Sequence, residues 1–584
     1  MKNHHFLALE LLEDRIAPAT IIVSSLADGG PGSLRQAIID ANAGAGFDDI
    51  VFQKPDGSPL KGTIKLASDL PDITDDLSIT GPISGSAKGI TIDGLKKNSI
   101  FTVQSSSFTL IDATVKNGRN DLGGAIQFNA GGGDALSLTN VILTANTAAS
   151  NPAVIAKGGA IFASNGLVVI HGSQITKNLA QGGNGAGGIS AGVAYGGGIL
   201  VSGGSLSITD SIVSGNTARG GNGEAGVGGS GKGAYGGGIY FASGANGTIA
   251  DTNITKNSAR GGNGGTGGPS MNGGSGGYGN GGGIYGYNSG SISIGSGSIV
   301  SSNLAQSGNG AKGGTGGSGG GSVNSWGGGI SIAGGVAAGM DIIESVVSGN
   351  KTVVGKSLDG SSFHSQGGGV AAKAGTIFIF KSTISSNSAD SGGGLQTSTS
   401  TTVDSSTISK NKAGFGGGIY HHSDNLDLVS VTISASSAVK NGGGIYQVSG
   451  TLKIDNSTIT KGKSASGGGI FALGGTANLE SSIIADNKAK TDPDIHGFVF
   501  SDYNLVGTVS MGTTLSGANN IKNIKPALGP LKLNGGPTAT HALKPNSPAI
   551  DTGNNPQGLL LDQRGSGFPR TVGGGTDIGA FEVQ

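Results

Sequence analysis

The sequence predicts an all-β chain wound into a right-handed parallel β-helix, with a short N-terminal helix covering its first coil. Glycine makes up 118 of 584 residues, two short units recur many times, and the last repeats are only about 25 residues long. Average proteins contain about 7% glycine. Each repeat holds three strand-like segments, which are too short to pair among themselves, so each must pair with its equivalent in the next coil. Such parallel crossovers are almost always right-handed.

The first recurring unit is Gly-Gly-Gly/Ala followed by an aliphatic residue. Glycine permits positive φ at a corner and lets neighbouring coils approach closely. We expect the aliphatic residue to point into the core. It occurs eleven times, as Ile126, Ile161, Ile199, Ile239, Ile284, Ile330, Val370, Leu395, Ile419, Ile445 and Ile470.

The second unit, Ser/Thr-x-Ile-x-x-Asn-x-Ala, follows each copy of the first. Asparagine tolerates left-handed backbone, and its amide both donates and accepts, so these side chains should stack as a ladder along the axis. The alanine two positions later should face a tight bend. The ladder residues are Asn146, Asn178, Asn216, Asn257, Asn303, Asn350, Asn387, Asn411 and Asn487, with Ser436 and Gly462 in the two exceptional coils. About fifteen coils spaced by about 4.8 Å predict a rod near 70 Å long.

A single helix is expected near the N-terminus. Ser33 and Gln36 have the spacing of a capping box, in which each side chain bonds the other residue's amide. Leu34, Ala37, Ile38 and Ala41 then share one helical face. A β-solenoid needs such an element to cover its first coil.

Composition narrows the functional classes. The chain has no cysteine, which excludes disulfides, and its 36 basic and 36 acidic residues balance. A nucleic-acid-binding protein normally shows a basic excess, so we expect no nucleic-acid partner. No segment approaches the ~18 apolar residues of a transmembrane helix. Glycine does not recur at every third position along the chain, which excludes collagen. We also expect no cofactor, no metal site and a monomeric rod.

Residues 1–20 are predicted to be an export segment. Residues 9–19 read LELLEDRIAPA, and this pattern resembles the sorting segment that opens many large surface proteins of planctomycete bacteria. The resemblance implies an exported chain that begins near Thr20 and lies outside the cell or at its surface, in association with the outer membrane. A short amphipathic helix is the alternative interpretation.

The chain divides into an N-terminal cap with the first coils (21–122), an eleven-repeat region (123–490) and a C-terminal segment (491–584). The last segment contains DYNLVG at 502–507, SPAIDTG at 547–553, DQRG at 562–565 and DIGAFE at 577–582. This series resembles the choice-of-anchor Q module of secreted bacterial β-helix proteins, which have a pectate-lyase-like solenoid. The repeats also resemble those of polymorphic outer-membrane proteins. We expect Asp551, Arg564, Arg570 and Asp577 to pair internally and hold this segment on the last coil.

Two acidic residues are the candidates for catalysis or cation binding. Asp210 and Asp251 lie six residues before the ladder asparagine in successive coils, so their backbones should be one strand spacing apart. Many β-helices degrade acidic glycans, which keeps a polysaccharide lyase or glycoside hydrolase as an alternative function. Solvated surface carboxylates are the simpler interpretation, and we assign no catalytic residue.

Aromatic residues follow the glycine unit in five coils. Alternation along a strand sends them outward if the preceding aliphatic residue points inward. An outward column could stack on sugars or on itself. The candidate ligand-binding rings are Tyr240, Tyr285, Tyr420, Tyr446 and Phe471. We therefore expect a structural or adhesin-like surface protein whose partners are polysaccharides or cell-surface components.

Gly-rich insertions at 179–366 enter at one corner of the coil. A second asparagine falls six residues after the ladder position in four consecutive coils, as Asn184, Asn222, Asn263 and Asn309. Random linkers would not keep this register. We expect the loop bases to continue the stacking, and the loops to form a flap over the neighbouring strand face that offers a binding surface.

Overall fold

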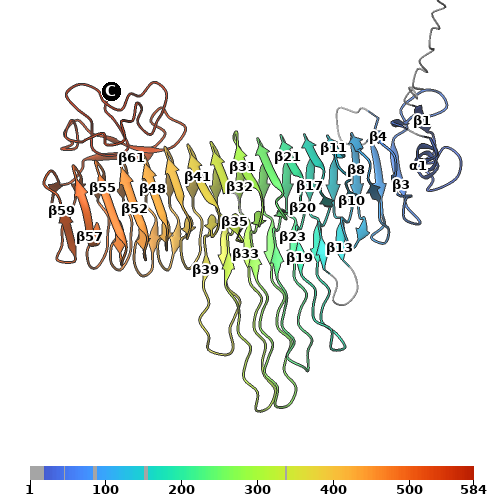
Figure 1. Cartoon of the computed structure of the whole chain (residues 1–584), viewed down its shortest axis with the longest axis horizontal. Coiled ribbons are helices and arrows are strands. Elements are labelled where there is room, and N and C mark those ends of the chain that lie inside the picture. The colour runs from blue at the N-terminus through green and yellow to red at the C-terminus, as the bar shows by residue number, and fades with distance from the viewer. Residues whose placement is uncertain (1–18, 45, 83–88, 150–154, 336–338) are drawn as a thin grey trace, which may run out of the picture.

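The computed structural model describes residues 19–44, 46–82, 89–149, 155–335 and 339–584. Apart from Ala19 and Thr20, which begin β1 (Ala19–Val23), the predicted export segment lies outside these residues. The described chain forms a long rod of stacked parallel strands (Figure 1), which confirms the parallel β-helix.

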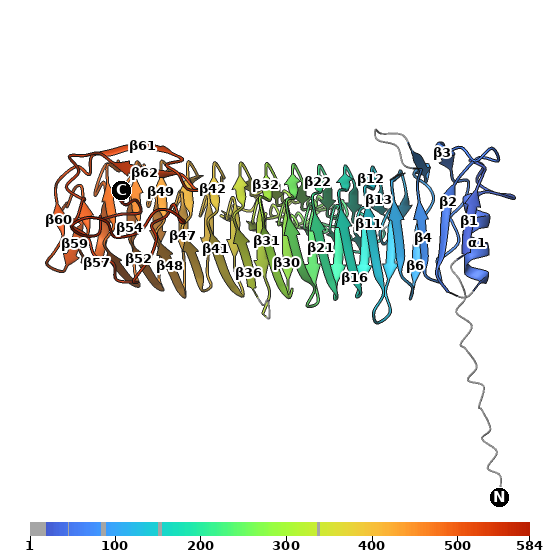
Figure 2. The same ribbon diagram turned by 90° about the horizontal axis from the view of Figure 1, so that it is seen from above.

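One helix, α1 (Leu34–Ala43), covers the N-terminal end of the rod (Figure 2). The side chain of Ser33 accepts a hydrogen bond from the Gln36 amide, as predicted. The reciprocal half of the capping box is absent, because the Gln36 side chain donates to Asp40 instead. Leu34, Ala37, Ile38 and Ala41 are buried, which confirms the predicted face.

A representative coil contains β20 (Ile199–Ser202), β21 (Ser205–Thr209), β22 (Ile212–Ser214), β23 (Thr217–Arg219) and β24 (Ala234–Tyr235). Each of these strands pairs in parallel with its equivalent 40 to 45 residues later, in the next coil. The pairs include Ile199 with Ile239, Leu206 with Gly247, and Val213 with Ile254.

Equivalent strands build sheets that run along the rod. The β20 and β21 types belong to a 29-stranded sheet that includes β1 and β59 (Thr513–Ser516). The β22 type forms a 16-stranded sheet from β3 (Gly62–Lys65) to β60 (Ile521–Lys522). Sixteen strands at about 4.8 Å span about 70 Å. The β23 type runs from β9 (Arg119–Asn120) to β38 (Lys351–Val353) and the β24 type from β14 (Ala156–Lys157) to β39 (Ser365–Gln366).

The core is the lumen of the coil. The eleven aliphatic residues of the first unit all have no exposed surface and belong to one hydrophobic cluster. At about 25 cal/mol per Å² of apolar surface, this continuous burial is the main stabilising contribution.

The asparagine ladder is present as predicted. The Oδ1 atom of Asn257 accepts from the backbone N–H of Asn216 at 3.0 Å and from its Nδ2 at 3.0 Å. The Nδ2 of Asn257 donates in turn to Asn303 and to the Val213 carbonyl. The same bonds repeat from Asn146 to Asn411, where the hydroxyl of Ser436 replaces the next amide.

A second ladder of hydroxyl groups precedes the β22-type strands. The backbone N–H of Ser173 donates to the Ser211 hydroxyl, that of Ser211 to Thr252, and that of Ser345 to Ser382. This column of hydroxyl groups was not predicted from the sequence. Both ladders satisfy buried backbone N–H groups at corners where no strand partner is available.

The five long loops project from one side of the rod as a flat layer (Figure 1), which we call the fin. Its loops follow β18 (Leu179–Gln181), β23, β28 (Ser258–Arg260), β33 (Leu304–Gln306) and β38. They comprise residues 182–193, 220–233, 261–278, 307–324 and 354–364. The predicted flap over a neighbouring strand face is therefore wrong, because the loops extend away from the rod.

Each fin loop has an outgoing and a returning leg, and the legs form two hydrogen-bonded layers. Within the outgoing layer, Gly220 N–H donates to the Arg260 carbonyl and Gly261 N–H to Gln306. Between the layers, Gly262 N–H donates to the Lys232 carbonyl. The backbone groups of successive residues in a leg thus point in three directions. A polyproline II helix, with three residues per turn, has the same periodicity.

Glycine is required inside the fin because the legs pack backbone against backbone. A Cβ atom on Gly262 would lie 1.9 Å from the Gly221 carbonyl oxygen, and one on Gly308 would lie 1.8 Å from that of Gly262. The backbone groups of each loop are already bonded to the neighbouring loops, so the loops do not fold onto the face of the rod.

At the base of the fin, Ala218, Ala234 and their equivalents form a small buried cluster, where the predicted tight bend lies.

The C-terminal segment lies along the side of the rod (Figure 1), over the outer face of the β22-type sheet. Residues 495–522 still supply coil strands, and the chain then forms β61 (Leu528–Lys532) and β62 (Thr540–Leu543). Its contacts reach several coils: Thr407 donates to the Ala539 carbonyl, Thr432 to Gln563, and Ala580 N–H to Thr458. The segment was expected to attach to the last coil. Instead it forms a clamp across successive coils.

The charged residues of this segment are engaged internally, as expected, although with other partners. Arg564 pairs with Asp562 at 2.7 Å and lies between the rings of Phe568 and Phe581. The carboxylate of Asp577 accepts from the backbone N–H groups of Asp551 and Val583, and Arg570 donates to the Asp577 carbonyl.

Candidate functional site

Asp210 and Asp251 lie at the corner between the β21-type and β22-type strands. Because Thr209 pairs with Ala250, the two aspartates are neighbours in successive coils, as predicted. Both have left-handed backbone, with φ of 50° and 47°. Aspartate is one of the residues that enter this region routinely, which gives it a structural reason to be here.

The surroundings of Asp210 are open to solvent. Its side chain is 60% exposed, and its carboxylate lies 3.5 Å from Nδ1 of His171 in the preceding coil. Asp251 is exposed as well. The pair is thus placed on an exposed corner, where water competes with any ligand.

Tyr240 and Tyr285 point away from the lumen, but they are only 7% and 4% exposed. Tyr195 of β19 (Ala194–Tyr195) packs on Tyr240 at 5.0 Å, and Tyr235 of β24 packs on Tyr285 at 5.3 Å. Burial raises the pKa of both hydroxyl groups. The two rings thus point outward as expected and stack on each other at 5.6 Å, but β19 and β24 cover them, so they offer little surface to a sugar.

A second aromatic column follows in the later coils. The rings of Tyr420 and Tyr446 stack at 5.5 Å, Tyr446 and Phe471 at 5.3 Å, and Phe471 and His496 at 4.2 Å. Tyr446 and Phe471 are 8% and 7% exposed. This confirms stacking of the column on itself, and it leaves little ring surface for a sugar.

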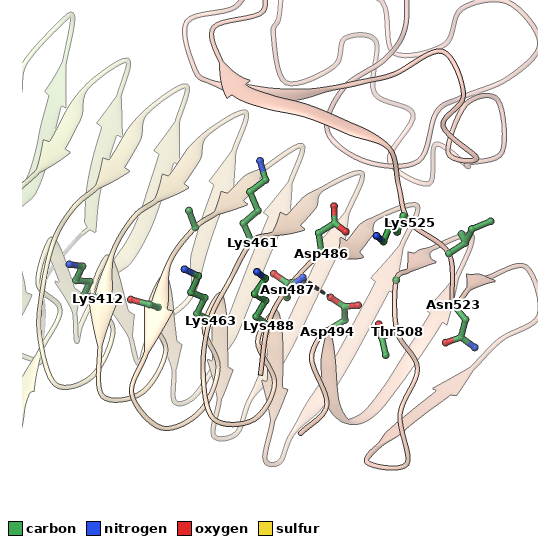
Figure 3. A pocket seen from close by; sticks show the side chains of 14 residues that line it. Lys412, Lys461, Lys463, Asp486, Asn487, Lys488, Asp494, Thr508, Asn523 and Lys525 are labelled. Carbon is green, nitrogen blue, oxygen red and sulfur yellow. Dashed lines mark hydrogen bonds between the residues drawn. The ribbon is translucent and has the colours of Figure 1, made fainter. Parts of the chain in front are cut away.

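The most distinctive polar cleft lies at the corner after the asparagine ladder, in the last coils. We call it the lysine groove; it has a volume of about 960 Å³. Figure 3 shows the labelled side chains lining it. Its basic residues are Lys412, Lys461, Lys463, Lys488 and Lys525.

Coil stacking places three of these lysines in one row. Lys412 begins β46 (Lys412–Ala413) and pairs with Ser437, which pairs with Lys463, which pairs with Lys488. Each therefore occupies the position directly after the ladder residue. Successive strands are about 4.8 Å apart, so Lys463 and Lys488 are one strand spacing apart, whereas Ser437 separates Lys412 from Lys463 by two.

The lysine groove carries an excess of positive charge. All five lysines are exposed, and none of them forms an ion pair among the described residues. Two carboxylates, Asp486 and Asp494, line the same cleft. Asp494 is buried and accepts hydrogen bonds from the N–H and Nδ2 of Asn487, which ends the ladder. Burial raises the pKa of Asp494 to about 6.

The lysine groove was not predicted from the sequence. Aligning the coils on the asparagine would have placed Lys412, Lys463 and Lys488 in one column. Lys525 gave no such signal, because it lies beyond the repeats and reaches the groove through the C-terminal segment.

Comparison with known proteins adds no assignment. No family model, curated protein or solved structure matches the chain. Among the described residues, no group of three His, Asp or Glu side chains could hold a metal ion. The helix in the described part of the chain is too short and too polar to cross a membrane.

Proposed function

We propose that this chain is an exported cell-surface rod with an adhesin-like role, and that it binds an acidic glycan through the lysine groove. The observation that carries the proposal is the row of exposed lysines without carboxylate partners. A carboxylated or sulfated sugar would supply the missing counter-charges, and a groove binds such a ligand better than an exposed corner does.

The resemblances at the two ends of the chain support the location. The segment 9–19 resembles planctomycete sorting segments, and residues 491–584 resemble a choice-of-anchor Q module. Both resemblances support export of the rod to the outside of the cell. A rigid scaffold that displays one binding groove suits adhesion to a polymer matrix.

The test is titration calorimetry of the purified chain with polygalacturonate oligomers, with neutral oligomers of equal length for comparison. We expect binding of the acidic oligomers only, and weaker binding at higher salt because exposed charges are screened. The double variant Lys463→Gln/Lys488→Gln should weaken binding several-fold, since exposed ion pairs contribute about 0.2–1 kcal/mol each.

A matched control is Lys410→Gln, which changes an exposed lysine of the same region outside the groove. Equal loss in the control and in the double variant would contradict a specific site. The same samples should be assayed for new unsaturated or reducing ends. Turnover would instead support the alternative, a polysaccharide lyase or glycoside hydrolase, and loss of turnover in Asp210→Asn would locate it at that corner.

A further inference from the structure

The outgoing face of the fin contains a second polar groove, with a volume of about 270 Å³. Its walls come from three successive loops. Arg219, Arg260 and Gln306 form one row, in register through β23, β28 and β33. Asn222, Asn263 and Asn309 form a parallel row three residues further along each leg.

The asparagine row presents its NH₂ donors to a ligand. The Oδ1 of Asn222 accepts from the Asn263 backbone N–H at 2.9 Å, and that of Asn263 accepts from Asn309 at 2.9 Å. The Oδ1 of Asn309 accepts from Lys356 N–H. Each oxygen is thus held by the next loop. The exposed NH₂ group, with two donors, is the part of the amide left for solvent or ligand.

The arginine row adds positive charge to these donors. Arg219 and Arg260 are exposed and form no ion pair among the described residues. Arg260 Nε donates to the Ser258 hydroxyl, which orients that guanidinium. Glu224, an acidic residue of the second fin loop, accepts hydrogen bonds from the backbone N–H groups of Gly187 and Gly188 in the first loop.

This groove and the lysine groove lie on one continuous row of paired segments. The row passes from β23 through β28 and β33 to Lys351 of β38, then to Ser388, Lys412, Ser437, Lys463 and Lys488. Arg219 and Thr217 flank the buried Ala218, and Lys412 occupies the Thr217 position beside the equivalent Ala413. Alternation therefore places the arginines and the lysines on the same outer face.

We infer that the fin groove is a second binding site for a linear polyanion, and that one carboxylated polysaccharide chain lies along the rod axis across both grooves. This inference rests on the proposed function. The guanidinium groups bind carboxylates, and the amide NH₂ groups bind carboxylate or hydroxyl oxygens. Because a long chain can occupy both grooves at once, affinity depends on the length of the chain that bridges them.

The experiment measures affinity for polygalacturonate chains of increasing length, from trimers to long polymer. Arg219→Gln/Arg260→Gln is the first variant, and Arg119→Gln, an exposed arginine of β9 outside both grooves, is its control. We expect wild type and control to bind long chains at least tenfold more tightly than trimers. The fin variant should lose this gain yet keep trimer binding in the lysine groove.

The variant Asn222→Asp/Asn263→Asp tests the donor pattern directly. An aspartate oxygen can still accept the neighbouring N–H, so the ladder is retained, but a carboxylate replaces each NH₂ group. Long-chain affinity should fall at least fivefold, with an unchanged circular dichroism spectrum. Unaltered long-chain binding in both fin variants would overturn the inference and leave the lysine groove standing.

Other outcomes separate the two proposals further. Unaltered trimer binding in Lys463→Gln/Lys488→Gln would overturn the lysine site and, with it, the bridging chain. Equal affinity of the wild type for inorganic polyphosphate of matched charge would mean general polyanion attraction and would overturn the polysaccharide assignment.

Discussion

At the scale of single residues, the ladder amides have a role that no apolar residue can fill. Each side chain connects three coils: it accepts from the coil before and donates to the coil after and to a strand carbonyl. Their burial is nearly complete, with Asn216 at 0% and Asn257 at 1% exposed. A buried N–H without an acceptor costs about 1–3 kcal/mol, so each ladder amide stabilises the corner at which it supplies that acceptor.

Asn257→Ala should lower the free energy of unfolding by about 3 kcal/mol, because the Asn216 N–H and the Val213 carbonyl lose their partner. Urea denaturation followed by circular dichroism measures this. Asn257→Ser should cost less, since Ser436 fills the same role naturally. Asn222→Ala in the exposed fin row is the control, and an equal loss there would contradict the importance of burial.

His421 makes stability depend on pH. It is fully buried in the lumen, in register with Thr397 and Gln447, and burial lowers its pKa to about 4. The unfolded chain has the ordinary pKa near 6.5 and binds the proton first. Stability should therefore fall as the pH drops from about 6.5 to about 4, by up to about 3 kcal/mol.

The variant His421→Leu should remove this part of the pH dependence, while His422→Leu, at an exposed neighbour, should retain it. Thermal unfolding of the three proteins between pH 4 and pH 7 makes the comparison. Parallel pH profiles for wild type and His421→Leu would rule out the histidine as the cause.

At the scale of elements, the fin is an addition to coils that can close without it. The corner after the ladder accepts four residues in the coil of Asn411 but 19 in the coil of Asn216. The fin loops bond mainly to one another, and their buried base consists of small alanine residues.

Replacing residues 217–235 with the connection found at 412–415 should therefore preserve the rod, with a melting temperature within a few degrees of wild type. Hydrogen exchange should rise in residues 182–193 and 261–278, which lose their bonded neighbour. Global unfolding of this variant would mean that the loops belong to the core.

The part of the structure that the sequence predicts also differs from element to element. The coil units were readable because one aliphatic residue and one asparagine recur in each turn. The fin was missed as a layer, although Arg260-Gly-Gly-Asn263-Gly-Gly-Thr266 contains a local triplet; glycine lacks this period along the whole chain, and only the triplet reveals the polyproline-like legs. The lysine groove depends partly on the C-terminal segment folding back, which no repeat encodes.

At the scale of the molecule, the rod is a stack in which each coil contacts its neighbours and little else. Stability in such solenoids is a sum of local terms, so damage stays local. The C-terminal segment is the exception, because it joins coils far apart in the sequence. Its buried cluster unites Ile483, Ala485 and Leu505 of the rod with Leu543, Ala549 and Ile578.

Removing residues 526–584 should test this division. The outward hydroxyl of Thr432 would lose its bond to Gln563, and Ile483 and Leu505 would lose their apolar cover. We expect hydrogen exchange to rise in residues 405–522, while the fin and the coils before residue 350 keep wild-type protection. The intact chain with Gln563→Ala removes the contacts to Ser406, Thr407 and Thr432 of the rod, together with those to Thr538 and Ala539 within the segment. It should show the same pattern more weakly. Protection lost evenly along the rod would mean instead that the clamp stabilises all the coils as one cooperative unit.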